Sequence, residues 1–279
     1  DRSFLHLHPN IACITSMDAD HLDIYGTSDA IEESFVEFAN KIEDKSKLFI
    51  TKDLPLKGVT VAVNEEAAYS AFNVRIDNGS YVFDINTPTG ILKDLRFGLP
   101  GRHNLMNALM AIAMAEIFGT PTEAIAVALA SFKGVKRRFS YQIKNDNLVY
   151  IDDYAHHPTE IDAVHQAVRE LYPNKKVLAV FQPHLFSRTR DFGDDFAKSL
   201  SKFDEVILMD IYPARELPIE GITSNWLLSK MDNQQKKIVQ KEEVINAILE
   251  SNARIIVTIG AGDIGEMVVS IKKALNETI

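Results

Sequence analysis

The spacing of hydrophobic positions changes near the middle of the chain. In the first part, short alternating runs are typical of strands, and Asn78-Gly79 predicts a hairpin turn between two of them. One amphipathic helix precedes these strands, and Asp29 with Glu32 predicts a capping box at its start. The elements expected here are a strand at residues 11–15, a helix from residue 29, strands within 48–97, and helices from residue 101 and over 122–131.

Strands and helices alternate in the second part of the chain. This order predicts the α/β class, with a doubly wound, mostly parallel sheet that binds ligands beyond the carboxyl ends of its strands. We place the domain boundary between the two parts, giving domains 1–137 and 138–279. The strands of the second domain are expected at residues 148–151, 176–181, 205–209, near 238 and at 255–259.

Composition and charge exclude several classes of protein. Among 279 residues, 39 are acidic and 30 are basic, so a general nucleic-acid surface is not expected. Cys13 is the one cysteine, which excludes a disulfide framework and fits a reducing compartment. Neither a signal peptide nor an apolar segment long enough to span a bilayer is recognisable. We therefore expect a cytoplasmic protein without a membrane partner.

The main candidate for chemistry follows the first strand of the second domain. Asp152, Asp153, His156 and His157 lie between that strand and a helix that Pro158 opens. Carboxylates and imidazoles at the carboxyl end of a strand, facing a helix N-terminus, are arranged as in a ligand site. A polar loop that only caps the helix is the alternative.

A second group of polar residues follows the next strand. His184, Arg188 and Arg190 fall at its carboxyl end, where arginines typically bind carboxylates or phosphates. Arg138 belongs to a basic run at residues 133–138 that would suit a phosphate group, and a solvated basic turn is the alternative.

Two patterns in the first domain also have competing explanations. The acidic loop at residues 18–23 fails the calcium-loop pattern but would suit Mg²⁺, or it is simply solvated. His103, Asn104 and Asn107 lie near one face of a helix start, where carboxamides either cap the helix or pair with a purine.

A glycine pattern near the end of the chain matches the dinucleotide fingerprint. Residues 260–265 place it between a strand and a helix, which makes a nicotinamide-binding oxidoreductase the alternative of another class. Few residues follow Gly265, so no second strand completes the unit, and Glu266 stands where a P-loop would need lysine. We interpret the glycines as a tight turn.

Taken together, five motifs resemble the Mur ligases. They are DADHLDIY at 18–25, GRHNLMN at 101–107, GVKRRF at 134–139, DDYAHHPT at 152–159 and QPHLFSRTRD at 182–191. The resemblance implies a ligase that uses ATP and Mg²⁺ to join L-alanine to UDP-N-acetylmuramate through an acyl phosphate. It also implies that residues 1–137 are the later part of the central ATP-binding domain, and that residues 138–279 form the C-terminal domain that binds the amino acid.

The resemblance also assigns roles to individual residues. His21 would stand at the Mg²⁺ position, and Asn104 and Asn107, beside His103, would contact adenine. Arg138 and Asp153 would contact the nucleotide. The residues that would frame the alanine and acyl-phosphate site are His156, His157, His184, Arg188 and Arg190.

Some positions depart from the family's pattern. Val36 stands where several sister ligases carry a carbamylated lysine, which favours the alanine-adding member, and Arg215 stands where many members have glycine. The chain contains no P-loop sequence, so we expect a fragment without the N-terminal domain. The nearest rival is the recycling ligase that adds a tripeptide to the same sugar nucleotide, which lacks the Pro-His-x-x-x-Arg-Thr-Arg run.

Overall fold

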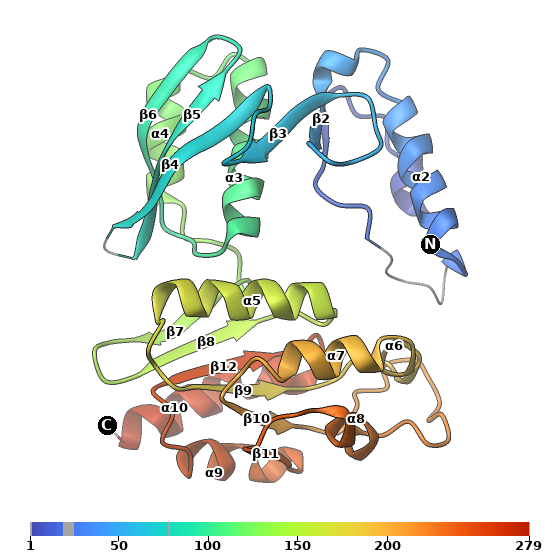
Figure 1. Cartoon of the computed structure of the whole chain (residues 1–279), viewed down its shortest axis with the longest axis vertical. Coiled ribbons are helices and arrows are strands. Elements are labelled where there is room, and N and C mark those ends of the chain that lie inside the picture. Colours follow the sequence, from blue (N-terminus) through green and yellow to red (C-terminus); the bar gives the residue numbers. More distant parts are fainter. Residues whose placement is uncertain (1, 19–24, 78, 279) are drawn as a thin grey trace. The chain divides into compact units, whose positions relative to one another are not determined.

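The computed structural model describes residues 2–18, 25–77 and 79–278. It divides into two compact units, residues 1–133 and 134–279, which Figure 1 shows. The division falls between Lys133 and Gly134, whereas the sequence analysis set the boundary after residue 137.

The first unit is built on a six-stranded sheet with the strand order β1-β2-β3-β4-β5-β6. The first four strands are parallel, and β4, β5 and β6 pair antiparallel, as the predicted hairpin requires. The turn residue Asn78 itself lies outside the described residues. The bounds are β1 Ala12–Ile14, β2 Leu48–Thr51, β3 Val59–Val63, β4 Tyr69–Asp77, β5 Ser80–Thr87 and β6 Gly90–Phe97.

Helices cover both faces of this sheet. Helices α3 and α4 bury their apolar side chains, among them Leu105 and Leu109, against β3 to β6, whereas α2 packs on β1 and β2. The predicted capping box of α2 is wrong, because the N-cap is Thr27, whose hydroxyl accepts the backbone N–H of Ala30 at 3.3 Å. The helices are η1 Ser3–His6, α2 Ser28–Asn40, η2 Lys45–Lys47, α3 Arg102–Ile117 and α4 Thr122–Ser131.

The second unit is built on a sheet with the strand order β11-β10-β9-β12-β8-β7. Every neighbouring pair is parallel except β7 with β8, which is antiparallel. The hydrophobic pattern predicts all the parallel strands but not β7, which lies at one edge of the sheet. The bounds are β7 Ser140–Lys144, β8 Val149–Asp153, β9 Val177–Phe181, β10 Glu205–Leu208, β11 Lys236–Ile238 and β12 Ile255–Ile259.

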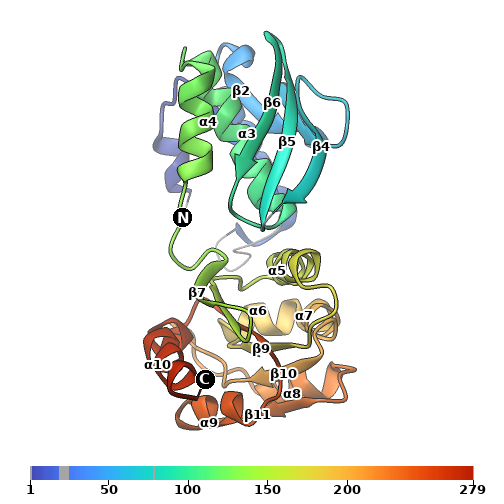
Figure 2. The same cartoon turned by 90° about the vertical axis from the view of Figure 1, so that its left-hand side faces the viewer.

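This sheet is covered on both faces, as a doubly wound fold requires. Helices α5, α7 and α8 pack on one face, and Figure 2 shows α9 and α10 on the opposite side from α5 and α7. The central strands β9 and β12 are wholly buried, which explains their continuous apolar sequences. The helices are α5 Pro158–Leu171, α6 Phe186–Asp191, α7 Gly193–Leu200, α8 Ser224–Lys230, η3 Lys241–Glu243, α9 Val244–Leu249, η4 Asp263–Met267 and α10 Val268–Thr278.

Candidate active site

Most of the predicted site residues of the second unit lie just beyond the carboxyl ends of the parallel strands. We call this end of the sheet the carboxyl edge. Residues 154–157 follow β8, and His184 follows β9, which β12 separates from β8 in the sheet. The rings of His156 and His184 contact each other in a tilted, edge-on arrangement, with centroids 6.1 Å apart. The strand order therefore brings together side chains from two motifs that are far apart in the sequence.

Arg137 holds the segment before β7 against the carboxyl ends of β8 and β12 through contacts with Asp152 and Gly260. The guanidinium of Arg137 donates to Asp152 Oδ2 at 3.3 Å and to the carbonyl of Gly260 at 2.6 Å, and it lies 4.9 Å from the centre of the Tyr154 ring. Asp152 also accepts the hydroxyl of Thr258 at 2.9 Å. Burial raises the pKa of Asp152, while Arg137 opposes that rise. This arginine is structural.

Asp153 holds the backbone on either side of β8. Its two carboxylate oxygens accept the backbone N–H of Phe139 at 2.7 Å and of Ala155 at 2.8 Å. Phe139 has a φ of 46° and Arg137 a φ of 62°, so these bonds help to hold a backbone conformation that such residues seldom adopt. Burial raises the pKa of Asp153 to about 6. A nucleotide contact by this residue stays a prediction.

His157 and Glu160 build the start of α5. His157 is the N-cap, and its Nδ1 accepts the backbone N–H of Thr159 at 3.4 Å. Glu160 reaches back to accept the backbone N–H of His156 at 2.8 Å and of His157 at 3.2 Å, which completes a capping box. His157 therefore does cap the helix, as the alternative interpretation of this loop predicts. This role does not by itself exclude a contact with substrate.

His184 and Arg188 form a compact pair on the other side of the site. Arg188 is only 6% exposed, and its Nη1 lies 3.3 Å from His184 Nδ1. The imidazole of His184 stacks on the ring of Tyr212, with centroids 5.7 Å apart. Burial and the nearby Arg188 lower the pKa of His184 to about 4, so this ring is neutral at physiological pH. A buried cation beside a neutral imidazole suits an anionic ligand.

The remaining arginines of this edge are more exposed. Arg190 donates to its neighbour Asp191 at 2.7 Å, and its side chain is 52% exposed. Arg138 is also about half exposed and lies 3.6 Å from Glu160. Arg215 belongs to a loop that Glu216 ties down by accepting the backbone N–H of Ser187 at 2.9 Å. The function of the Arg215 loop stays open.

The glycines of the fingerprint accommodate side chains of the protein itself. A Cβ on Gly262 would lie 2.4 Å from Gln182 Oε1, and one on Gly265 would lie 2.4 Å from the guanidinium carbon of Arg137. Gly260 has a φ of 148°, which other residues rarely adopt. These positions are thus part of a tight strand-to-helix turn, which agrees with our interpretation of the sequence.

The predicted nucleotide residues of the first unit differ in burial. Asn104 is 8% exposed and its Nδ2 donates to the carbonyl of Pro100 at 2.7 Å, at the start of α3. His103 and Asn107 are exposed on the same helix. Their shared helix face is therefore divided between a buried amide and two exposed side chains. Contact of His103, Asn104 and Asn107 with adenine stays a prediction.

The predicted magnesium ligand cannot be placed. His21 lies outside the described residues. In the part of the chain that the structure does describe, no three histidine, cysteine or acidic side chains gather to hold a metal ion. Mg²⁺ often takes only one or two protein ligands, with phosphates and water completing its shell. Binding of Mg²⁺ at His21 therefore stays a prediction.

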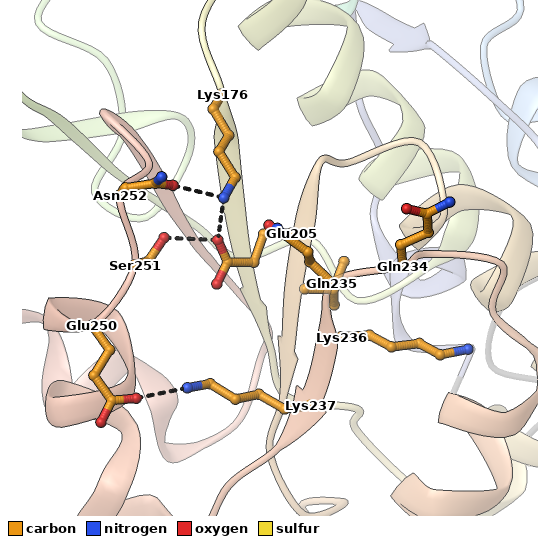
Figure 3. A pocket seen from close by; sticks show the side chains of 10 residues that line it. Lys176, Glu205, Gln234, Gln235, Lys236, Lys237, Glu250, Ser251 and Asn252 are labelled. Atoms are coloured by element: carbon orange, nitrogen blue, oxygen red, sulfur yellow. Dashed lines mark hydrogen bonds and ion pairs between the residues drawn. The ribbon is translucent and has the colours of Figure 1, made fainter.

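A hollow of about 430 Å³, shown in Figure 3, lies where the amino ends of strands β9, β10, β11 and β12 meet. Its lysines already have partners within the protein. Lys176 donates to Asn252 at 2.7 Å and pairs with Glu205 at 3.0 Å, and Lys237 pairs with Glu250 at 3.1 Å. Lys236 donates to a backbone carbonyl at 3.1 Å. These cations are committed to the fold, so the carboxyl edge remains the candidate site.

Comparison with known families now decides the classification. The model of the Mur ligase middle domain matches residues 2–115, and that of the Mur ligase glutamate ligase domain matches residues 137–262. The chain belongs to the Mur ligase family. The family resemblance seen in the sequence is thereby confirmed, and the dinucleotide-binding oxidoreductase is not supported.

Individual Mur ligases match along the whole chain. The UDP-N-acetylmuramate–L-alanine ligase of Flavobacterium johnsoniae is 77% identical over 279 residues, covering 100% of this chain and 62% of the relative. Among solved structures, the UDP-N-acetylmuramate–alanine ligase of Thermotoga maritima superposes with a TM-score of 0.79 at 24% identity, over 100% of this chain and 62% of that one. The MurF ligase of Thermotoga maritima, solved in complex with ADP, has a TM-score of 0.73 at 16% identity, over 97% of this chain and 63% of that one.

These comparisons also set the extent of the match. The chain spans about 62% of the length of the curated Mur ligase it resembles. In the part of the chain that the structure describes, no helix is long and apolar enough to cross a membrane.

Proposed function

We propose that the full-length protein joins L-alanine to UDP-N-acetylmuramate in an ATP-dependent reaction. The observation that carries this proposal is the 77% identity, along the whole chain, to a ligase of that name. The carboxyl edge of the second sheet supplies chemistry that suits the reaction, since a buried arginine and a neutral imidazole lie side by side there.

The proposed reaction has a demanding electrostatic step. ATP would transfer its terminal phosphoryl group to the muramoyl carboxylate, and the amine of alanine would then attack the resulting acyl phosphate. Two anions must approach each other in the first step, and fixed cations lower the cost of that approach. Arg188 is suited to this role because it is held in place by its burial. Arg138 and Mg²⁺, with His21 as its predicted ligand, would act on the nucleotide side.

Protons must also be removed for the amide to form. The ammonium group of alanine loses one proton before its nitrogen attacks the acyl carbon, and the C–N bond forms as the C–O bond to phosphate breaks. A second proton leaves the nitrogen, and the product phosphate departs as hydrogen phosphate. A neutral imidazole is the side chain best suited to accept a proton near neutral pH.

The tripeptide-adding ligase is the alternative that the same substrates can test. We expect phosphate release by the full-length protein to require ATP, Mg²⁺, UDP-N-acetylmuramate and L-alanine together. L-alanine and the tripeptide would be supplied in competition, with the amide product identified by mass spectrometry. Exclusive use of the tripeptide would reject our assignment, and so would phosphate release that ignores both acceptors.

A further inference from the structure

Glu160 contacts two groups of predicted site residues, the histidines at 156–157 and Arg138. Its Oε2 accepts the backbone N–H of both His156 and His157, and its Oε1 lies 3.6 Å from Arg138. The side chain is 34% exposed, so the carboxylate is partly shielded from water. It is thus a charged group whose position is fixed by the start of α5.

The neighbours of His156 determine which ring nitrogen carries its proton. Nδ1 lies 2.9 Å from the carbonyl oxygen of Tyr154 and 3.4 Å from Glu160 Oε2. Both of these oxygens can only accept a hydrogen bond, so Nδ1 must carry the hydrogen. In the neutral ring, the lone pair is then on Nε2.

The neighbour of His184 imposes the opposite arrangement. Arg188 has no acceptor, so its Nη1, 3.3 Å from His184 Nδ1, must donate to that nitrogen. The Nδ1 of His184 therefore carries the lone pair, and its Nε2 carries the hydrogen. The stacked ring of Tyr212 fixes the plane of this imidazole.

We propose that the Tyr154 carbonyl together with Glu160 holds His156 in one tautomer and that Arg188 holds His184 in the opposite one, so that the site offers one proton acceptor and one hydrogen-bond donor. In the ligase reaction, Nε2 of His156 takes the proton that the alanine ammonium loses before attack. Nε2–H of His184 donates to an oxygen of the acyl phosphate. Glu160 is then a positioning residue, which acts on substrate only through His156. This inference rests on the proposed function for its substrates, but the tautomers themselves do not.

The charges around both rings agree with this division. His156 faces Glu160, the ring of Tyr154 and His184, whereas His184 faces Arg188, Arg215 and Glu216. Nδ1 of His156 faces two oxygen acceptors, which leaves Nε2 as the nitrogen of this ring that can accept a proton. The cations beside His184 disfavour a second positive charge. His156 is therefore the ring that accepts a proton, and His184 is the ring that donates a hydrogen bond.

The first test reads the tautomers directly in this chain. Nitrogen-15 NMR distinguishes a protonated ring nitrogen from one with a lone pair, and His156→Gln and His184→Gln variants assign the two signals. We expect a protonated Nδ1 in His156 and a protonated Nε2 in His184 at neutral pH. The reverse pattern in either ring would overturn the proposal. The result does not depend on whether the substrates have been correctly identified.

The second test measures catalysis in the full-length protein. Glu160→Gln keeps an oxygen for the backbone N–H groups but removes the charge, so we expect kcat to fall roughly tenfold to a hundredfold. The KM for alanine should change little, because Glu160 acts on the substrate only through His156. Glu170→Gln, on the same helix, is the matched control. An unchanged kcat in Glu160→Gln, with native thermal stability, would show that Glu160 only caps the helix.

These two tests separate the inference from the proposed function. If the wild-type protein forms no alanyl amide while the NMR pattern is as expected, the substrate assignment fails and the tautomers stand. If the amide forms while either ring shows the other tautomer, the proposed function stands and this inference fails.

Discussion

Asp153 allows the effect of a buried carboxylate on folding to be measured in this chain. Burial raises its pKa from 3.8 to about 6, against the opposing effect of the two backbone N–H groups that it accepts. The folded state therefore binds the proton more tightly than the unfolded state. The contribution of Asp153 to the free energy of unfolding should fall as pH rises from about 4 to about 6, and stay constant above that. The difference between the two pKa values corresponds to about 3 kcal/mol.

Asp153→Asn removes this titration without changing the volume of the side chain. The amide offers one oxygen and one NH₂, so one of the two backbone N–H groups would face a donor, at a cost of about 1–3 kcal/mol at every pH. We expect the stability advantage of the wild type over Asp153→Asn to be largest near pH 4. Between pH 4 and pH 7 this difference in the free energy of unfolding should shrink by about 3 kcal/mol. If the cost of the amide is small, Asp153→Asn should become the more stable protein at pH 7.

Urea unfolding can follow the second unit alone, because Trp226 on α8 is the single tryptophan of the chain. Carbon-13 NMR of the Asp153 carboxyl carbon gives its pKa independently. Asp146→Asn, at an exposed turn between β7 and β8, controls for the loss of one negative charge. A wild-type advantage that grows with pH would refute the reasoning, because the two backbone hydrogen bonds would then outweigh burial.

Three further predictions concern the site and its surroundings. Arg188→Ala and Arg190→Ala should each lower kcat/KM of the full-length ligase, which corresponds to a loss of transition-state stabilisation of roughly 2 kcal/mol or more. Unchanged kinetics with an altered melting temperature would show that the residue acts in folding and not in the site. Gly262→Ala should destabilise the second unit by about 1–3 kcal/mol in urea, since its Cβ would lie 2.4 Å from Gln182 Oε1, whereas a loss below a few tenths would show that the turn relaxes. The chain alone should bind ATP no better than on the order of millimolar and release no phosphate, because it has no P-loop sequence; calorimetric titration and a phosphate assay check this, and micromolar binding would contradict it.

The sequence was most informative where local pattern and long-range packing agree. Strand β12 and helix α4 occupy the residues that the pattern predicts. The five-residue apolar run of β12 has the length of a buried strand, and the ten-residue, mostly apolar segment of α4 is long enough for a helix. Pro158 similarly marks the first residue of α5. The strand β7 was missed because it lies at the sheet edge, where its alternating pattern is interrupted by a bulge between Tyr141 and Ile143.

The partners of the site residues were not predictable in the same way. Within the basic run, Arg138 was singled out, but Arg137 is the residue that pairs with Asp152 and with the carbonyl of Gly260. Two adjacent arginines have the same chemistry, and only the backbone at this position decides which of them points inward. Glu160 was likewise missed. A capping box, with an acid three residues after the N-cap, was the available signal.

The fingerprint at residues 260–265 shows why a motif needs its surroundings. In a dinucleotide site, glycines leave room for a phosphate group to approach the backbone. Here Gly262 leaves room for Gln182 and Tyr212, and Gly265 leaves room for Arg137. The same spacing of glycines thus serves two different purposes. What separates them is the identity of the atoms that fill the space, and in this chain those atoms belong to side chains that follow β9 and β10 or precede β7.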